Sequence, residues 1–178
     1  MKELLTKLGL DIDLSGDELL ERLKEMQEEI LEQLNREQDA ELLRQVFEWF
    51  HKAAEQGNAE AQFELGEAYD DGVGVEQDYS RAAEWYRKAA EQGYAEAQNS
   101  LGACYYNGSG VAKDQAKAVE WFQKAAEQAN VMAQFNMGLC YEYGTGVPVD
   151  KTKAVEWYRK AAEQDNQDAK KALERLGG

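Results

Sequence analysis

The stretch EWYRKAAEQG, residues 84–93, decides how this chain is built, because close copies of it recur at a fixed distance. The copies begin at Glu48, Glu84, Glu120 and Glu156, so each starts 36 residues after the one before. Landmarks between the copies keep the same spacing: a leucine or methionine followed by glycine, a tyrosine, a Gly-x-Gly-Val stretch and an aspartate. A fixed period of about 20 to 50 residues is typical of a solenoid.

Each period is predicted to contain two helices. Ala61, Leu65 and Tyr69 keep the spacing of one helical face. The Gly-x-Gly-Val stretch then breaks this helix, because glycine adopts the positive φ values that a chain reversal needs. Asp78 is placed to cap the second helix. The predicted buried stripe of that helix consists of Ala82, Trp85, Tyr86, Ala89 and Ala90.

Two sets of glycines are predicted to have different structural roles. Gly66, Gly102 and Gly138 lie inside predicted first helices, where glycine costs about 1 kcal/mol relative to alanine. We expect this cost to be offset by close approach of the two helices of a pair. Gly57 and Gly93 follow the second helices, where a left-handed residue commonly ends a helix.

The pattern AEAQxxLGxxYxxGxGVxxDxxxAxEWYxKAAEQG resembles the Sel1-like repeat, a relative of the tetratricopeptide repeat, over roughly residues 48–165. The resemblance implies an all-α, right-handed α/α superhelical solenoid of helix-turn-helix repeats with helical caps. It also implies an adaptor for protein complexes that has no catalysis of its own. The predicted units are an N-terminal helical cap (1–37), the second helix of an incomplete repeat (38–57), three repeats (58–93, 94–129 and 130–165) and a C-terminal capping helix (166–178).

The two ends depart from the repeat pattern. In the last segment Glu174 stands where the earlier repeats have glycine, and the polar residues around it suit the outer surface of a cap. Near the N-terminus, strong helix formers surround one apolar face, which is typical of an idealised sequence. We therefore expect a redesigned or grafted cap, and so an engineered chain. The apolar face consists of Leu19, Leu23, Met26, Ile30 and Leu34.

The stretch DIDLSGDELLER, residues 11–22, begins like a calcium-binding EF-hand loop, with Asp11 and Asp13 at the first and third positions. Such a loop needs a bidentate carboxylate at position twelve, and Arg22 stands there. Ser15 and Glu18 instead have the spacing of a capping box, in which each side chain bonds the backbone N–H of the other residue. The stretch therefore predicts a helix start and no calcium site.

No other set of residues indicates a catalytic, metal-binding or cofactor-binding site. His51 is the only histidine, and a histidine without a periodic partner supports no acid–base role. Cys104 and Cys140 occupy equivalent positions and read as small buried residues. We predict no catalytic residues, no metal, no cofactor and no enzymatic activity. The tryptophans are predicted to be core residues: Trp49, Trp85, Trp121 and Trp157.

Charge and hydropathy restrict the partners. The formal net charge is −15, which argues against nucleic acid and anionic membrane surfaces, because both attract clustered Lys and Arg. A basic or apolar protein or peptide fits better. No apolar run approaches the roughly 20 residues of a membrane span, and the charged N-terminus is unlike a signal peptide. We therefore expect a cytosolic (cytoplasmic) location.

A tetratricopeptide-like register predicts that the first helices line a concave groove. This groove would be acidic towards its N-terminal end and more apolar towards its C-terminal end. Its apolar residues could instead belong partly to the core. The predicted groove residues are Glu60, Phe63, Glu67 and Asp70, then Glu96, Asn99, Ala103 and Tyr106, then Met132, Phe135, Leu139 and Glu142.

Two functions are consistent with these features. The first is a non-enzymatic interaction scaffold designed for a structural or self-assembling purpose, which would form homo-oligomers. The alternative is a natural cytosolic adaptor that binds a basic-apolar peptide segment in the groove. The oligomeric state in solution separates them, because a defined oligomer would favour designed assembly.

Overall fold

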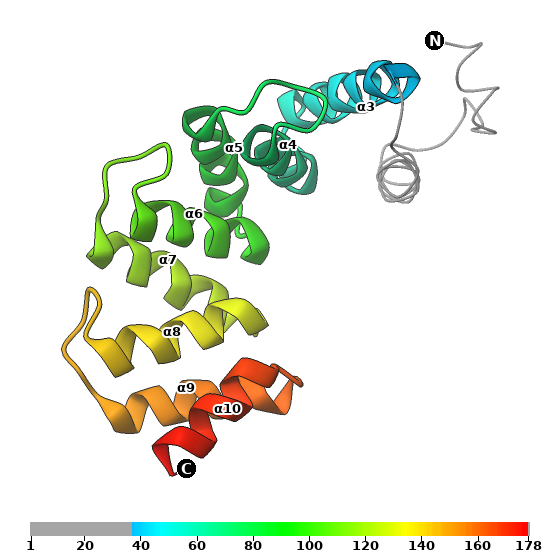
Figure 1. Cartoon of the computed structure of the whole chain (residues 1–178). Helices are drawn as coiled ribbons and strands as arrows, with labels where there is room; N and C mark the ends of the chain where they lie inside the picture. The colour runs from blue at the N-terminus through cyan, green and yellow to red at the C-terminus, as the bar shows by residue number, and fades with distance from the viewer. Residues whose placement is uncertain (1–36, 178) are drawn as a thin grey trace.

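A computed structural model describes residues 37–177, with side chains from residue 43 onwards. Every regular element in this part of the chain is an α-helix, and the helices follow one another along a curved array (Figure 1). The fold is an all-α, right-handed solenoid of helix pairs. Its helices are α3 (Glu37–Glu55), α4 (Ala59–Asp71), α5 (Tyr79–Glu91), α6 (Ala95–Asn107), α7 (Gln115–Glu127), α8 (Val131–Tyr143), α9 (Lys151–Glu163) and α10 (Gln167–Leu176).

We call α4, α6, α8 and α10 the first helices, and α3, α5, α7 and α9 the second helices. The pairs α4 with α5, α6 with α7, and α8 with α9 are each joined by a Gly-x-Gly-Val loop. The predicted N-terminal cap, the apolar face of residues 17–34 and the capping box at Ser15 lie outside the described residues. α10 lies where the C-terminal capping helix is predicted.

The second helices α5, α7 and α9 begin at aspartate caps, as predicted for Asp78. Its Oδ1 accepts hydrogen bonds from the backbone N–H groups of Ser80 (3.0 Å) and Arg81 (3.1 Å). Asp114 and Asp150 cap the next two second helices in the same way. Each cap satisfies backbone donors that have no partner inside the helix.

The first helices end at glycines that need positive φ. Gly72 has φ of 73°, and its N–H bonds back to the carbonyl of Ala68. Gly57 and Gly93 also have positive φ, at 91° and 92°, which confirms their predicted role after the second helices. The equivalent positions in the later repeats hold Ala129 (φ 63°) and Asp165 (φ 66°), where a Cβ makes the left-handed conformation costly.

The glycines inside the first helices mark close contact between paired helices, as predicted. A Cβ on Gly66 would lie 2.5 Å from the ring of Tyr86, and one on Gly102 would lie 2.6 Å from the ring of Phe122. A Cβ on Gly138 would meet the ring of Tyr158 in the same way. The absence of a side chain therefore lets each first helix lie directly on an aromatic ring of its pair.

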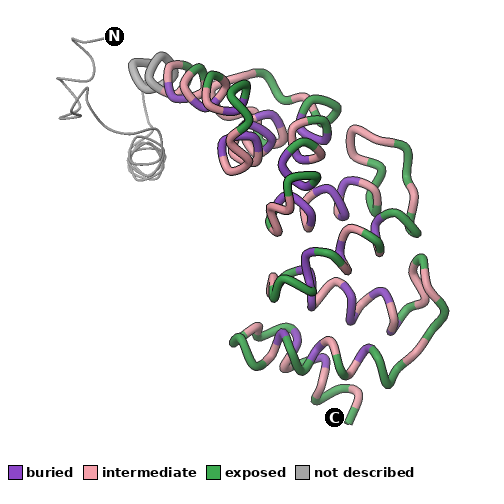
Figure 2. Tube along the Cα trace, turned by 180° about the vertical axis from the view of Figure 1, so that it is seen from behind, coloured by how far each residue is buried: buried purple, intermediate pink, exposed green. Residues whose placement is uncertain are grey.

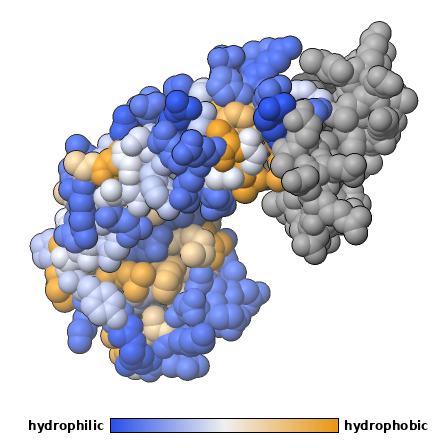
Figure 3. All heavy atoms as spheres, turned by 45° about the horizontal axis from the view of Figure 1, so that its top comes forward, coloured by the Kyte–Doolittle hydropathy of each residue, from blue (hydrophilic) through white to orange (hydrophobic). Residues whose placement is uncertain are grey.

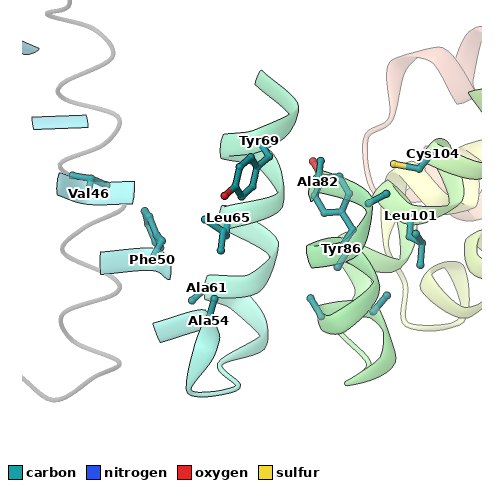
Figure 4. Packing of buried hydrophobic residues seen from close by; sticks show 14 residues of the cluster. Val46, Phe50, Ala54, Ala61, Leu65, Tyr69, Ala82, Tyr86, Leu101 and Cys104 are labelled. Atoms are coloured by element: carbon teal, nitrogen blue, oxygen red, sulfur yellow. The ribbon is translucent and has the colours of Figure 1, made fainter. Parts of the chain in front are cut away.

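Buried residues recur on the helices along the array (Figure 2) and form three hydrophobic clusters. Figure 4 shows Leu65 and Tyr69 of α4 between Phe50 of α3 and Tyr86 of α5. Small buried residues, mostly alanine, fill the remaining space between helices. Cys104 is 6% exposed and Cys140 is 2% exposed, so both are buried as predicted.

The prediction that the tryptophans are core residues is only partly right. Trp49, Trp85, Trp121 and Trp157 are half-buried and lie at the edge of the core. The buried aromatic is the next residue along each second helix: Phe50, Tyr86, Phe122 and Tyr158. A one-residue step rotates a helix by about 100°, so the tryptophan turns outwards. The ammonium groups of Lys88, Lys124 and Lys160 cover three of these indole rings at 3.4–3.9 Å from the ring centroids.

Two glutamines per repeat join successive helix pairs. The amide nitrogen of Gln98, in α6, donates to the carbonyl of Ala90 (3.1 Å), and its amide oxygen accepts from Gln128 at the end of α7 (2.8 Å). The same arrangement recurs around Gln62 and Gln134. Because a buried amide without partners is costly, this glutamine relay fixes how one repeat sits on the next.

Candidate binding surface

The residues predicted to line a groove lie on α4, α6 and α8, and all but one of them are exposed or half-buried, although Phe63, Glu67 and Phe135 also contact tyrosines of the paired second helices. Met132 is 53% exposed and Tyr106 is 40% exposed, whereas Phe63, Phe135 and Leu139 are half-buried. Glu142 is the exception, because only 8% of it is exposed. We call the surface formed by these helices and α10 the first-helix face.

Equivalent positions along this face meet at three junctions between successive first helices. Three repeat positions define each junction: two residues at the C-terminal end of one first helix and one residue in the next first helix. The residues are Asp70, Asp71 and Ala103 at the α4/α6 junction, Tyr106, Asn107 and Leu139 at the α6/α8 junction, which line one cavity, and Glu142, Tyr143 and Arg175 at the α8/α10 junction, which are joined by hydrogen bonds. Because the residues at these equivalent positions differ, charge and polarity differ from one junction to the next.

The α8/α10 junction is closed by an arginine of the chain itself. The guanidinium of Arg175 forms an ion pair with Glu142 Oε1 at 2.5 Å and donates to Glu142 Oε2 at 2.8 Å. It also donates to the hydroxyl of Tyr143 at 3.2 Å. Tyr158 donates its hydroxyl to Glu142 Oε2 at 2.7 Å. Burial alone would raise the pKa of Glu142, but the hydrogen bonds from Arg175 and Tyr158 outweigh it and hold that pKa below its usual value.

The α6/α8 junction contains a cavity of about 310 Å³. Ala103 and Leu139 form apolar walls, and the buried ring of Phe122 borders the cavity from α7. Polar groups surround these walls, and one of them, Asn136, donates to Asn99 at 2.9 Å. Such a mixture of apolar walls with a few polar groups is typical of ligand pockets, whose volumes begin at about 300 Å³. The remaining lining residues are Tyr106, Asn107, Cys140, Tyr143 and Thr145.

Hydrophobic surface gathers over the C-terminal repeats. Figure 3 shows hydrophobic residues in the lower part of the molecule with hydrophilic residues on both sides. Phe135 packs against the ring of Tyr158, with the centroids 5.6 Å apart, so it belongs partly to the core, as the alternative interpretation allowed. Met132 and Leu139 extend the apolar surface beside it.

The α4/α6 junction is acidic and half-buried. Glu67 accepts a 2.5 Å hydrogen bond from the hydroxyl of Tyr86, and Asp70 and Asp71 follow in the last turn of α4. Burial raises the pKa of Glu67, and repulsion from Asp71 and Asp70 adds to this effect. Burial and repulsion from Asp71 also raise the pKa of Asp70. Within residues 43–177, no lysine or arginine forms an ion pair with these three carboxylates.

The other candidate groups show no catalytic arrangement. Burial raises the pKa of the Cys104 and Cys140 thiols to about 11, so both are protonated near neutral pH and are poor nucleophiles. His51 stacks edge-on against Trp85 and lies 3.6 Å from Glu55. No cluster of metal-ligating side chains occurs among the residues that the structure describes. In the same part of the chain, none of the helices combines the length and apolarity that crossing a bilayer requires.

Comparison with known proteins identifies the repeat. The model of the Sel1 repeat matches residues 47–58, 59–94, 95–130 and 131–166. The chain belongs to the Sel1 repeat family. Its 36-residue period, its interhelical glycines and its Gly-x-Gly-Val loops are thus features of Sel1 repeats, and Sel1 repeat proteins generally mediate protein–protein interaction without catalysis.

Solved Sel1 repeat structures resemble this one. The c5321 protein of uropathogenic Escherichia coli, described as a protective antigen with an SLR fold, is 48% identical with a TM-score of 0.70. A Sel1 repeat protein from Oxalobacter formigenes is 40% identical with a TM-score of 0.67. Each match covers 71% of this chain, but only 27% of the first protein and 52% of the second.

A more distant relative shares the fold. Cysteine-rich protein B of Helicobacter pylori is 23% identical with a TM-score of 0.60, and the match covers 75% of this chain and 96% of that protein. No curated protein matches the chain.

Sequence reasoning missed three features of the Sel1 repeats. It did not find the cavity, the arginine at the α8/α10 junction, or the glutamine relay. A signal for the relay was available, because the glutamines of AEAQ and AAEQ recur at every period. The arginine was also visible, since Arg175 is the only cation at a position where Glu67, Ala103 and Leu139 stand in the three repeats.

Proposed function

We propose that this chain is a protein-interaction module that binds an extended segment of a partner protein across its first-helix face. The cavity at the α6/α8 junction is the observation that supports this proposal most directly. Its apolar walls and polar surroundings suit an apolar side chain whose neighbouring backbone forms hydrogen bonds. The acidic α4/α6 junction and the net charge of −15 favour a partner segment with basic residues.

A panel of random peptides selected on the immobilised full-length chain tests this proposal. Ala103→Trp places a large side chain at the cavity wall, whereas Glu156→Trp places the same residue on the exposed surface of α9. We expect selected peptides to share an apolar residue, and to lose at least tenfold in affinity for Ala103→Trp but not for Glu156→Trp. Equal binding to both variants would show that the cavity is not the peptide site.

The same face could instead hold a second copy of the chain, which is the self-assembling scaffold predicted from the idealised N-terminal sequence. Light scattering over a range of concentrations separates the two functions. A monomer that binds the selected peptides fits the interaction module. An oligomer that Ala103→Trp dissociates, in the absence of any peptide, would replace it with self-assembly.

A further inference from the structure

The α8/α10 junction shows how this repeat binds an arginine, and the equivalent positions of the α4/α6 junction are acidic and include no arginine. Asp70 and Asp71 occupy the positions of Glu142 and Tyr143 two periods earlier. Ala103 occupies the position of Arg175. The chain therefore supplies only a methyl group at the position where the last junction has a guanidinium.

The carboxylate pKa values at the two junctions are shifted in opposite directions. Arg175 lies against Glu142, whose pKa is lowered. At the α4/α6 junction, burial and mutual repulsion raise the pKa of Glu67 and Asp70. Half-buried carboxylates that repel one another cost free energy in the unbound chain, and an added cation would recover it.

The two junctions lie next to each other along the face. Ala103 forms a wall of the cavity at the α6/α8 junction. Its neighbour Cys104 lies near the acidic turn of α4, because burial and then the charges of Asp70 and Glu67 raise the pKa of the Cys104 thiol. An occupant of the cavity therefore has the carboxylates of α4 within reach of its neighbouring residues. This adjacency indicates that a partner segment would place one residue in the cavity and another at the α4/α6 junction. Arg175, which the chain itself binds at the α8/α10 junction, indicates that the second residue is an arginine.

We propose that the α4/α6 junction binds an arginine of the partner segment, and that an apolar residue a few positions away enters the cavity. This inference rests on the proposed function and specifies its partner as an arginine-containing apolar segment. The guanidinium lies where Arg175 lies in the last junction, above Ala103. Glu67 and Asp70 accept its hydrogen bonds. A guanidinium suits such a site better than an ammonium, because it donates several hydrogen bonds in one plane.

Synthetic peptides test the arginine site on the full-length chain. Each fluorescent peptide carries one arginine and one phenylalanine separated by one to four alanines. For the best spacing, we expect at least a tenfold loss of affinity when citrulline replaces arginine, and a smaller loss when lysine replaces it. Citrulline keeps the shape and removes the charge, so equal binding of the citrulline peptide would overturn the proposal.

Two charge-matched variants localise the site. Glu67→Gln with Asp70→Asn removes two charges at the α4/α6 junction, and Glu84→Gln with Glu91→Gln removes two exposed charges on α5. We expect only the first pair to weaken the arginine peptide at least tenfold, and to leave the citrulline peptide unchanged. Equal weakening by both pairs would mean that net charge alone attracts the peptide.

The unbound chain gives a second measurement. The double variant Glu67→Gln with Asp70→Asn removes the repulsion between these carboxylates. It should therefore be at least as stable to heat at pH 7 as the wild type, so a loss of binding cannot come from misfolding. The two proposals also fail differently. If phenylalanine peptides bind the cavity regardless of arginine, the interaction module stands and the arginine site is wrong. If no peptide responds to Ala103→Trp, both are wrong.

Discussion

Replacing an interhelical glycine by alanine should destabilise the protein by an amount that depends on how freely the facing ring can move. At Gly138 the facing ring belongs to Tyr158, which is fully buried and whose hydroxyl is bonded to Glu142. At Gly102 the facing ring belongs to Phe122, which has no hydroxyl and borders the cavity. The second ring therefore has space to move, whereas the first does not.

The expected magnitudes follow from two opposing terms. Alanine gains about 1 kcal/mol over glycine in helix propensity, and overpacking a core costs about 1–3 kcal/mol. At Gly138 the ring cannot move, so we expect a net loss of about 1–2 kcal/mol. At Gly102 part of the strain is relieved, so the variant should lie within about 1 kcal/mol of the wild type.

Thermal and urea unfolding of the two variants measures this difference. For a chain of this size about 1 kcal/mol corresponds to about 2–4 °C in Tm, so Gly138→Ala should melt about 2–8 °C lower than the wild type. Glu174→Gly, at the equivalent position of α10, measures the propensity term alone because no second helix follows α10 among the described residues. If Gly138→Ala is as stable as Gly102→Ala, the hydroxyl bond of Tyr158 does not fix the ring.

Three further results are expected. Ala129→Gly should stabilise the protein by about 0.5–1 kcal/mol, because Ala129 has φ of 63° and glycine removes most of the left-handed strain. The control is Gln128→Gly. Because Gln128 has φ of −88°, this change should not stabilise the protein in the same melting experiment. Arg175→Met should cost about 1–2 kcal/mol near neutral pH. Because the folded pKa of Glu142 is lowered, its contribution is present above the unfolded value of about 4.3 and is lost as pH falls through the folded pKa, so urea midpoints of variant and wild type should converge as pH falls through that folded pKa. Millimolar calcium should leave Tm unchanged, since the stretch at residues 11–22 lacks the bidentate carboxylate; a rise of several degrees would restore the EF-hand interpretation.

The period made most of the fold predictable from the sequence. Helix starts at aspartate, helix ends at glycine and close approach at Gly66, Gly102 and Gly138 all depend on local geometry that recurs every 36 residues. The tryptophan prediction was only partly right because the predicted stripe contained both Trp85 and Tyr86, whereas helical phase places only the second of these neighbours fully in the core.

The binding surface was less predictable, since its shape depends on differences between repeats. The cavity exists where Ala103 and Phe122 stand together, and neither residue alone indicates it. The closed α8/α10 junction required knowing that Arg175 and Glu142, 33 residues apart, face each other across two helices. Glu142 was therefore expected on an open groove and is instead buried under an arginine.

The glutamine relay has a consequence for how the gene can change. Each relay bond joins residues 8 or 30 positions apart, and both separations fit within neighbouring periods. Duplicating or deleting one 36-residue unit by unequal recombination would therefore recreate every relay bond at the new boundary. Each added unit would also bring one more junction on the first-helix face, whose chemistry three or four codons determine. Such an array can lengthen first and acquire a new recognition position afterwards, without passing through a misfolded ancestor.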